Sequence, residues 1–144
     1  MKRIVVIFTF LLAMINLSCQ RHADRALNPL VEEWTTPFGV PPFDEIKLEH
    51  YGPAFEEAMK QHEAEIEAIT SNGEEPTFEN TILAFDCSGL LLERVSLVFG
   101  MLSAAETNAE MQQIEAEMMP LLAAHSDRIM LNEQLFDRIR AVYE

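Results

Sequence analysis

The segment from Thr77 to Ala104 is apolar on most sides of the helix that its spacing predicts, with Thr77 as the expected N-cap. Its clear polar stripe is narrow and consists of Glu79, Asp86 and Glu93, seven residues apart. A helix that is apolar on most sides must be buried on most sides. The chain has 144 residues and offers few elements to bury it, which indicates a part of something larger.

Three further helices are predicted around this segment. The first has Pro53 in its opening turn and ends near residues 71–73, where Ser-Asn-Gly is a natural stop. The next opens at a capping box formed by Thr107 and Glu110, and the last is capped by Asn132. No strand pattern appears after residue 44. The predicted fold is therefore all-α, with antiparallel helices joined by short loops.

Residues 19–43 are predicted to be a tether followed by an extended segment. Four prolines between Asn28 and Phe43 block a helix and favour extended geometry. Trp34, Phe38 and Phe43 lie in the same stretch, and a disordered linker rarely carries three large aromatic residues in so short a run. We expect this segment to cross the helices with its rings buried.

Residues 1–18 have the pattern of a secretory signal peptide. A basic start precedes an apolar run from Ile4 to Ile15, which is shorter than the ~20 residues that span a bilayer. Ser18 before Cys19 resembles the bacterial lipoprotein cleavage box, although Asn16 replaces the usual apolar residue. We predict an exported lipoprotein, anchored through Cys19 in the periplasm or at the outer membrane, with a simply cleaved signal peptide as the alternative.

The charge of the chain argues against one class of partner. The formal net charge is -14, with 24 acidic residues against 10 basic ones. Such a surface repels phosphate backbones, so nucleic-acid binding is not expected. The acidity itself identifies no partner, because solvated acidic helix faces are common.

The histidines do not have the spacing of a helical zinc site. Such a site needs two histidines at i and i+4 and a glutamate beside the first. The only His-Glu pair is His62-Glu63, and position i+4 is Ile66, which cannot bind a metal. His62 and His125 fall on apolar helix faces and are predicted to be a boundary and a core histidine. We therefore expect neither a catalytic nor a metal-binding residue in this chain.

The sulfur-containing side chains are predicted to fill the core. Cys87 lies in an apolar helical stretch and has no adjacent base, so it is expected to be a small buried side chain. Met111, Met118 and Met119 could line a peptide groove, but core packing is the favoured interpretation. Ser88 precedes a glycine, yet no strand leads into it, so it is not a nucleophile elbow.

Several ungapped blocks of the chain occur in the order of a known family, and the clearest are Asn28-Pro29-Leu30, residues 37–44, Glu49-His50-Tyr51, residues 53–57, residues 76–82 and residues 122–127. These blocks resemble the start of bacterial peptidyl-dipeptidase and oligopeptidase A, of the thimet oligopeptidase family of zinc metallopeptidases. The resemblance covers nearly everything after residue 27.

The resemblance implies a large, mostly helical, two-lobed enzyme that binds one zinc and cuts short peptides. The zinc motif of the family lies several hundred residues beyond this region. Residues 44–144 would then be a truncated N-terminal helical region, inactive alone, whose partners are the remainder of the catalytic domain, short peptides and, through the lipid, a membrane. A standalone helical lipoprotein that acts as a binding module is the alternative.

Overall fold

The computed structural model describes residues 28–144. These residues contain no strand, which confirms the all-α prediction. The predicted signal peptide and Cys19 lie outside the described residues. The elements, in chain order, are η1 (Pro37–Gly39), η2 (Leu48–His50), α2 (Tyr51–Thr70), the π-helical η3 (Phe78–Leu83), α3 (Ala84–Asp86), α4 (Leu90–Ala105), α5 (Ala109–Met130) and α6 (Glu133–Tyr143).

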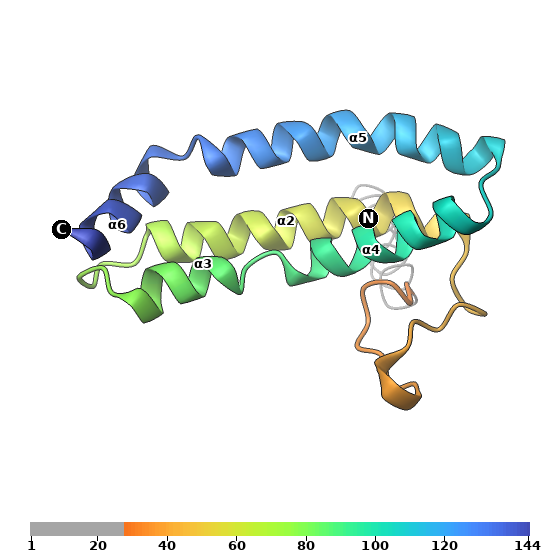
Figure 1. Ribbon diagram of the computed structural model, residues 1–144, viewed down its shortest axis with the longest axis horizontal. Helices are drawn as coiled ribbons and strands as arrows, with labels where there is room; N and C mark the ends of the chain where they lie inside the picture. Colours follow the sequence, from red (N-terminus) through yellow and green to blue (C-terminus); the bar gives the residue numbers. More distant parts are fainter. Residues whose placement is uncertain (1–27) are drawn as a thin grey trace, which may run out of the picture.

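The central helix is α2, and the other helices pack along it (Figure 1). The η3–α3–α4 limb returns antiparallel to α2 on one side, and α5 runs back along the other side. The short α6 folds against the C-terminal end of α2. Successive long helices are therefore antiparallel, as the short connections predict.

One apolar cluster holds the N-terminal half of α2 against α4. Phe99 lies edge-to-face on Tyr51 and Phe55, with ring centroids 4.9 and 5.7 Å apart. Val95 and Val98 complete this contact from α4. Edge-to-face rings pair the positive edge of one ring with the negative face of the other. Burial raises the pKa of Tyr51 to about 12, and among the described residues its hydroxyl has no hydrogen-bond partner.

A second apolar cluster closes the other end of the bundle. Ile66 and Ile69 of α2 pack there with Ile129 of α5 and Leu135 of α6. Asn132 caps α6, because its Oδ1 accepts a hydrogen bond from the Leu135 backbone N–H at 3.0 Å, as predicted. Met111 and Met118 of α5 belong to the first cluster, and α6 contacts both α2 and the η3 start of the other limb, so the two clusters fix α5 and α6 against α2.

The predicted single helix from Thr77 to Ala104 is wrong in its middle. Thr77 is the N-cap, and its Oγ1 accepts from the Asn80 backbone N–H at 3.1 Å. The helix then ends at Asp86 and restarts at Leu90, because Gly89 adopts a left-handed conformation with φ 72°. A glycine takes this conformation without the clash that a Cβ brings.

The break changes the environment of Cys87 and of two methionines. Cys87 is exposed, so the prediction of a buried side chain is wrong. It lies in the turn between α3 and α4 rather than on the inner face of a continuous helix. In α5, Met111 and Met118 are buried as predicted, whereas Met119 is exposed. The cap of α5 is Asn108 rather than Thr107, since Asn108 Oδ1 accepts from the Met111 backbone N–H at 2.9 Å.

The segment before α2 buries only part of what was predicted. Trp34 is half-buried, and its indole N–H donates to the Pro29 carbonyl oxygen at 2.7 Å. Phe38 is fully exposed at 103% and Phe43 is exposed at 41%, so the prediction of buried rings is wrong for both. Phe38 has φ 63° inside the η1 turn, which projects from the helices (Figure 1).

Candidate functional site

The strongest cluster of polar side chains is a histidine pair between α2 and α5. His62 of α2 and His125 of α5 are 63 residues apart, yet His62 Nδ1 and His125 Nε2 lie 3.1 Å from each other. His125 is 2% exposed, and His62 is half-buried. The structure thus confirms both as core and boundary histidines. The structure also shows a contact between the two side chains that their separation in the sequence did not predict.

The Ser88 hydroxyl indicates which nitrogen of His62 carries its proton. The Ser88 hydroxyl donates to the Phe85 carbonyl oxygen at 2.7 Å, so its oxygen accepts from His62 Nε2–H at 3.2 Å. Neutral His62 then presents the lone pair of Nδ1, which accepts from His125 Nε2–H. Burial lowers the pKa of His62, and the neighbouring His125 lowers it further, against the opposing effect of Glu65 and Glu63.

The far side of the pair faces an ion pair. His125 Nδ1 lies 3.5 Å from Glu63 Oε1 and, among residues 28–144, makes no hydrogen bond. The same Glu63 oxygen is 2.7 Å from Arg128 Nη2. Both side chains of this ion pair are about half exposed, so water screens it and it adds little stability.

The break at Gly89 fits against the same pair. The Gly89 backbone N–H donates to Glu65 Oε2 at 2.7 Å, which joins the break to α2. A Cβ built on Gly89 would lie 2.9 Å from the imidazole ring of His62. Gly89 is therefore required twice, for its positive φ and for the close approach of this ring.

The polar atoms of these groups are directed mainly at one another and at the backbone. Within residues 28–144, no three His, Cys, Asp or Glu side chains gather in a way that could hold a metal ion. The two histidine nitrogens are committed to each other, and the Ser88 hydroxyl is committed to a backbone carbonyl. The arrangement supplies a hydrogen-bonded polar contact between three segments, which fixes α5 and the break against α2.

A second polar group, Arg94, fixes the segment before α2. Its Nη2 donates to the carbonyl oxygens of Leu30 and Val31 at 2.8 and 2.9 Å, and its guanidinium lies 4.8 Å from the centre of the Trp34 ring. Burial lowers the pKa of Arg94. Sequence reasoning missed this residue, although Arg94 is the only basic residue between Phe78 and Ala105.

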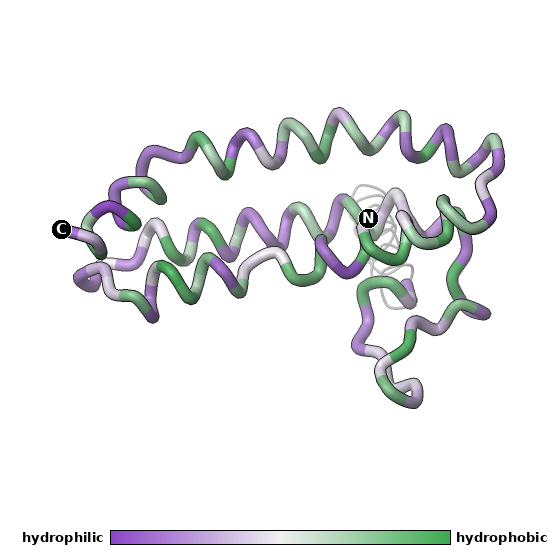
Figure 2. The backbone as a smooth tube through the Cα atoms, viewed as in Figure 1, coloured by the Kyte–Doolittle hydropathy of each residue, from purple (hydrophilic) through white to green (hydrophobic). Residues whose placement is uncertain are grey.

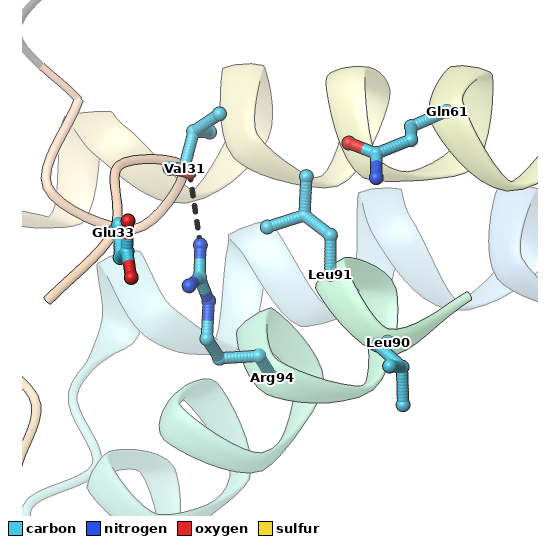
Figure 3. A pocket seen from close by; sticks show the side chains of 6 residues that line it. All are labelled: Val31, Glu33, Gln61, Leu90, Leu91 and Arg94. Atoms are coloured by element: carbon cyan, nitrogen blue, oxygen red, sulfur yellow. Dashed lines mark hydrogen bonds between the residues drawn. The ribbon is translucent and has the colours of Figure 1, made fainter. Parts of the chain in front are cut away.

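An open pocket of about 350 Å³ lies beside Arg94 (Figure 3). Leu90, Leu91, Gln61, Val31 and Glu33 line the rest of it. The Arg94 side chain is turned toward the Val31 carbonyl, and the acidic Glu33 also lines the pocket. The pocket therefore does not present a free cation to an anionic ligand.

No helix within residues 28–144 is long and apolar enough to cross a membrane.

Comparison with known proteins identifies relatives of the chain. It is 45% identical to the dipeptidyl carboxypeptidase of Escherichia coli over 118 residues and to that of Salmonella typhimurium over 117 residues. It is 27% identical to the oligopeptidase A of Salmonella typhimurium over 113 residues. No model of a known protein family matches the chain.

The alignments cover most of this chain but little of each relative. The two dipeptidyl carboxypeptidase alignments take in 81% and 82% of the chain and only 17% of the relative. The predicted resemblance is confirmed, because the chain is similar to dipeptidyl carboxypeptidase and oligopeptidase A, which are members of the thimet oligopeptidase family. The chain therefore spans about one sixth of the length of these two curated relatives.

Proposed function

We propose that this chain is a non-catalytic helical portion of an exported zinc metallopeptidase that hydrolyses short peptides, of the peptidyl-dipeptidase or oligopeptidase type. The 45% identity to dipeptidyl carboxypeptidase, confined to 17% of that protein, carries the proposal. The export signal and the lipid on Cys19 rest on the pattern of residues 1–19.

The chemistry of the described residues supports a structural role. The relatives are named as peptidases, so the enzyme that we propose needs a catalytic centre. The histidines of the described residues do not fit a zinc site. His62 and His125 are the two histidines that meet, and no third ligand joins them among the described residues. The zinc would therefore be held by the part of the enzyme that corresponds to the remaining length of the relatives.

A fusion protein tests this proposal. Residues 28–144 replace the matching segment of Escherichia coli dipeptidyl carboxypeptidase, and zinc-dependent hydrolysis of a short peptide is measured. We expect activity within about tenfold of the parent, because related segments share their core and tolerate surface change. The corresponding segment of oligopeptidase A, which is 27% identical to this chain, is the matched control. A soluble, zinc-loaded fusion with no activity, beside an active control, would refute the proposal.

A further inference from the structure

The outer side of α4 carries an apolar stripe formed by Leu90, Leu97 and Met101. At 3.6 residues per turn, these side chains fall within about 40° of one another around the helix. Leu90 and Leu97 are each 59% exposed and Met101 is 54% exposed. Single exposed apolar side chains are common on protein surfaces, but three aligned on one side of a helix indicate a contact surface.

The described fold does not use this stripe. Val95, Val98 and Phe99 project from the opposite side of α4 and pack on α2. Figure 3 shows the contrast at the start of the helix, where Leu91 points toward α2 and Leu90 points away from it. Figure 2 shows the hydrophobic colour along most of α4. The apolar character predicted on most sides of this segment thus has an unburied half.

The charges beside the stripe restrict what covers it. Glu93 and Arg94 flank the stripe on α4. Glu93 is exposed, whereas the Arg94 guanidinium is turned away onto the Leu30 and Val31 carbonyl oxygens, so the carboxylate is the charge left at the stripe. A second copy of the chain is disfavoured, because each copy carries a net charge of -14 and the two would repel each other. An anionic lipid surface is disfavoured by the same charge. A complementary partner has an apolar seam flanked by lysine or arginine.

We propose that the stripe Leu90, Leu97 and Met101 is the surface on which the remaining part of the peptidase packs, through an apolar helix face flanked by basic side chains. This inference rests on the proposed function, because the relatives contain roughly five-sixths of their length outside the matched region. At the stripe, the remaining part of the peptidase would complete the burial of α4, because a helix that is apolar on most sides must be buried on most sides.

Thiol labelling of single cysteines tests the proposal. The background is the full chain with Cys19→Ser and Cys87→Ser, studied alone and joined to the remainder of Escherichia coli dipeptidyl carboxypeptidase. Leu90→Cys and Leu97→Cys report on the stripe, and Val98→Cys is the matched buried control, 2% exposed and adjacent in sequence. Labelling is located by mass spectrometry, so other cysteines of the fusion do not interfere.

We expect both stripe cysteines to react readily in the chain alone and at least about tenfold more slowly in the joined protein, while Val98→Cys stays slow in both. Equal rates at positions 90 and 97 in the two proteins would overturn the inference. So would slow, concentration-dependent labelling in the chain alone, which would mean that a second copy covers the stripe. Peptidase activity of the same fusion judges the proposed function separately, since labelling does not depend on turnover.

Discussion

The substitution Gly89→Ala should destabilise the protein through two separable effects. Alanine at φ 72° carries left-handed strain of about 1–2 kcal/mol. Its Cβ would also lie 2.9 Å from the His62 ring, which must then move. Moving the ring breaks the hydrogen bonds to Ser88 and His125, at about 1 kcal/mol each. Alanine also lowers the conformational entropy of the unfolded chain, which offsets about 0.4–1 kcal/mol of this loss. The expected net loss is about 2–3 kcal/mol.

Two other glycines separate strain from contact, with the free energy of unfolding measured in urea by circular dichroism. Gly39 has φ 66° but open space around its Cβ position, so Gly39→Ala should cost about 1 kcal/mol or less. Gly73 has neither feature, so Gly73→Ala should be neutral or slightly stabilising. In a His62→Ala background, the cost of Gly89→Ala should fall to that of Gly39→Ala. Equal losses for Gly89→Ala and Gly39→Ala in the wild-type background would refute the ring contact.

Three further outcomes follow from the core, the histidine pair and the arginine. Phe55→Ala should lower the free energy of unfolding by about 3–5 kcal/mol, because it removes a buried ring. Tyr51→Phe should leave it unchanged or raise it by up to about 1 kcal/mol, because the buried Tyr51 hydroxyl has no hydrogen-bond partner among the described residues. The pKa of His62 in the folded protein is below its usual 6.5, so the unfolded chain binds the proton of this residue more tightly. The free energy of unfolding should therefore be highest above pH 6.5 and fall as the pH drops below it. In His62→Gln, the plot of this free energy against pH should be flatter below pH 6.5 than in wild type. Arg94→Met should shift the emission of Trp34, the single tryptophan, to longer wavelength without unfolding the helices, and an unchanged spectrum would contradict the guanidinium contact.

Local sequence patterns determined most helix positions. Apolar residues at three- and four-residue spacing predicted α2 and α5, because this spacing gives a helix one buried side whatever lies against it. Thr77 and Asn132 were identified as caps because a short polar side chain can satisfy the first free N–H groups within its own segment. The family resemblance could also be recognised before the structure, because it depends on residue identity and order alone.

The tertiary structure decided the features that depend on residues far apart in the chain. The break at Gly89 is joined to Glu65, 24 residues earlier, and no periodicity within residues 77–104 encodes that contact. The approach of His125 to His62 likewise depends on how α5 crosses α2. Phe38 and Cys87 were predicted to be buried from composition, but the exposure of a side chain is set by which neighbours cover it. For the same reason the sequence showed that α4 is apolar nearly all round, and only the structure showed which side its own neighbours leave uncovered.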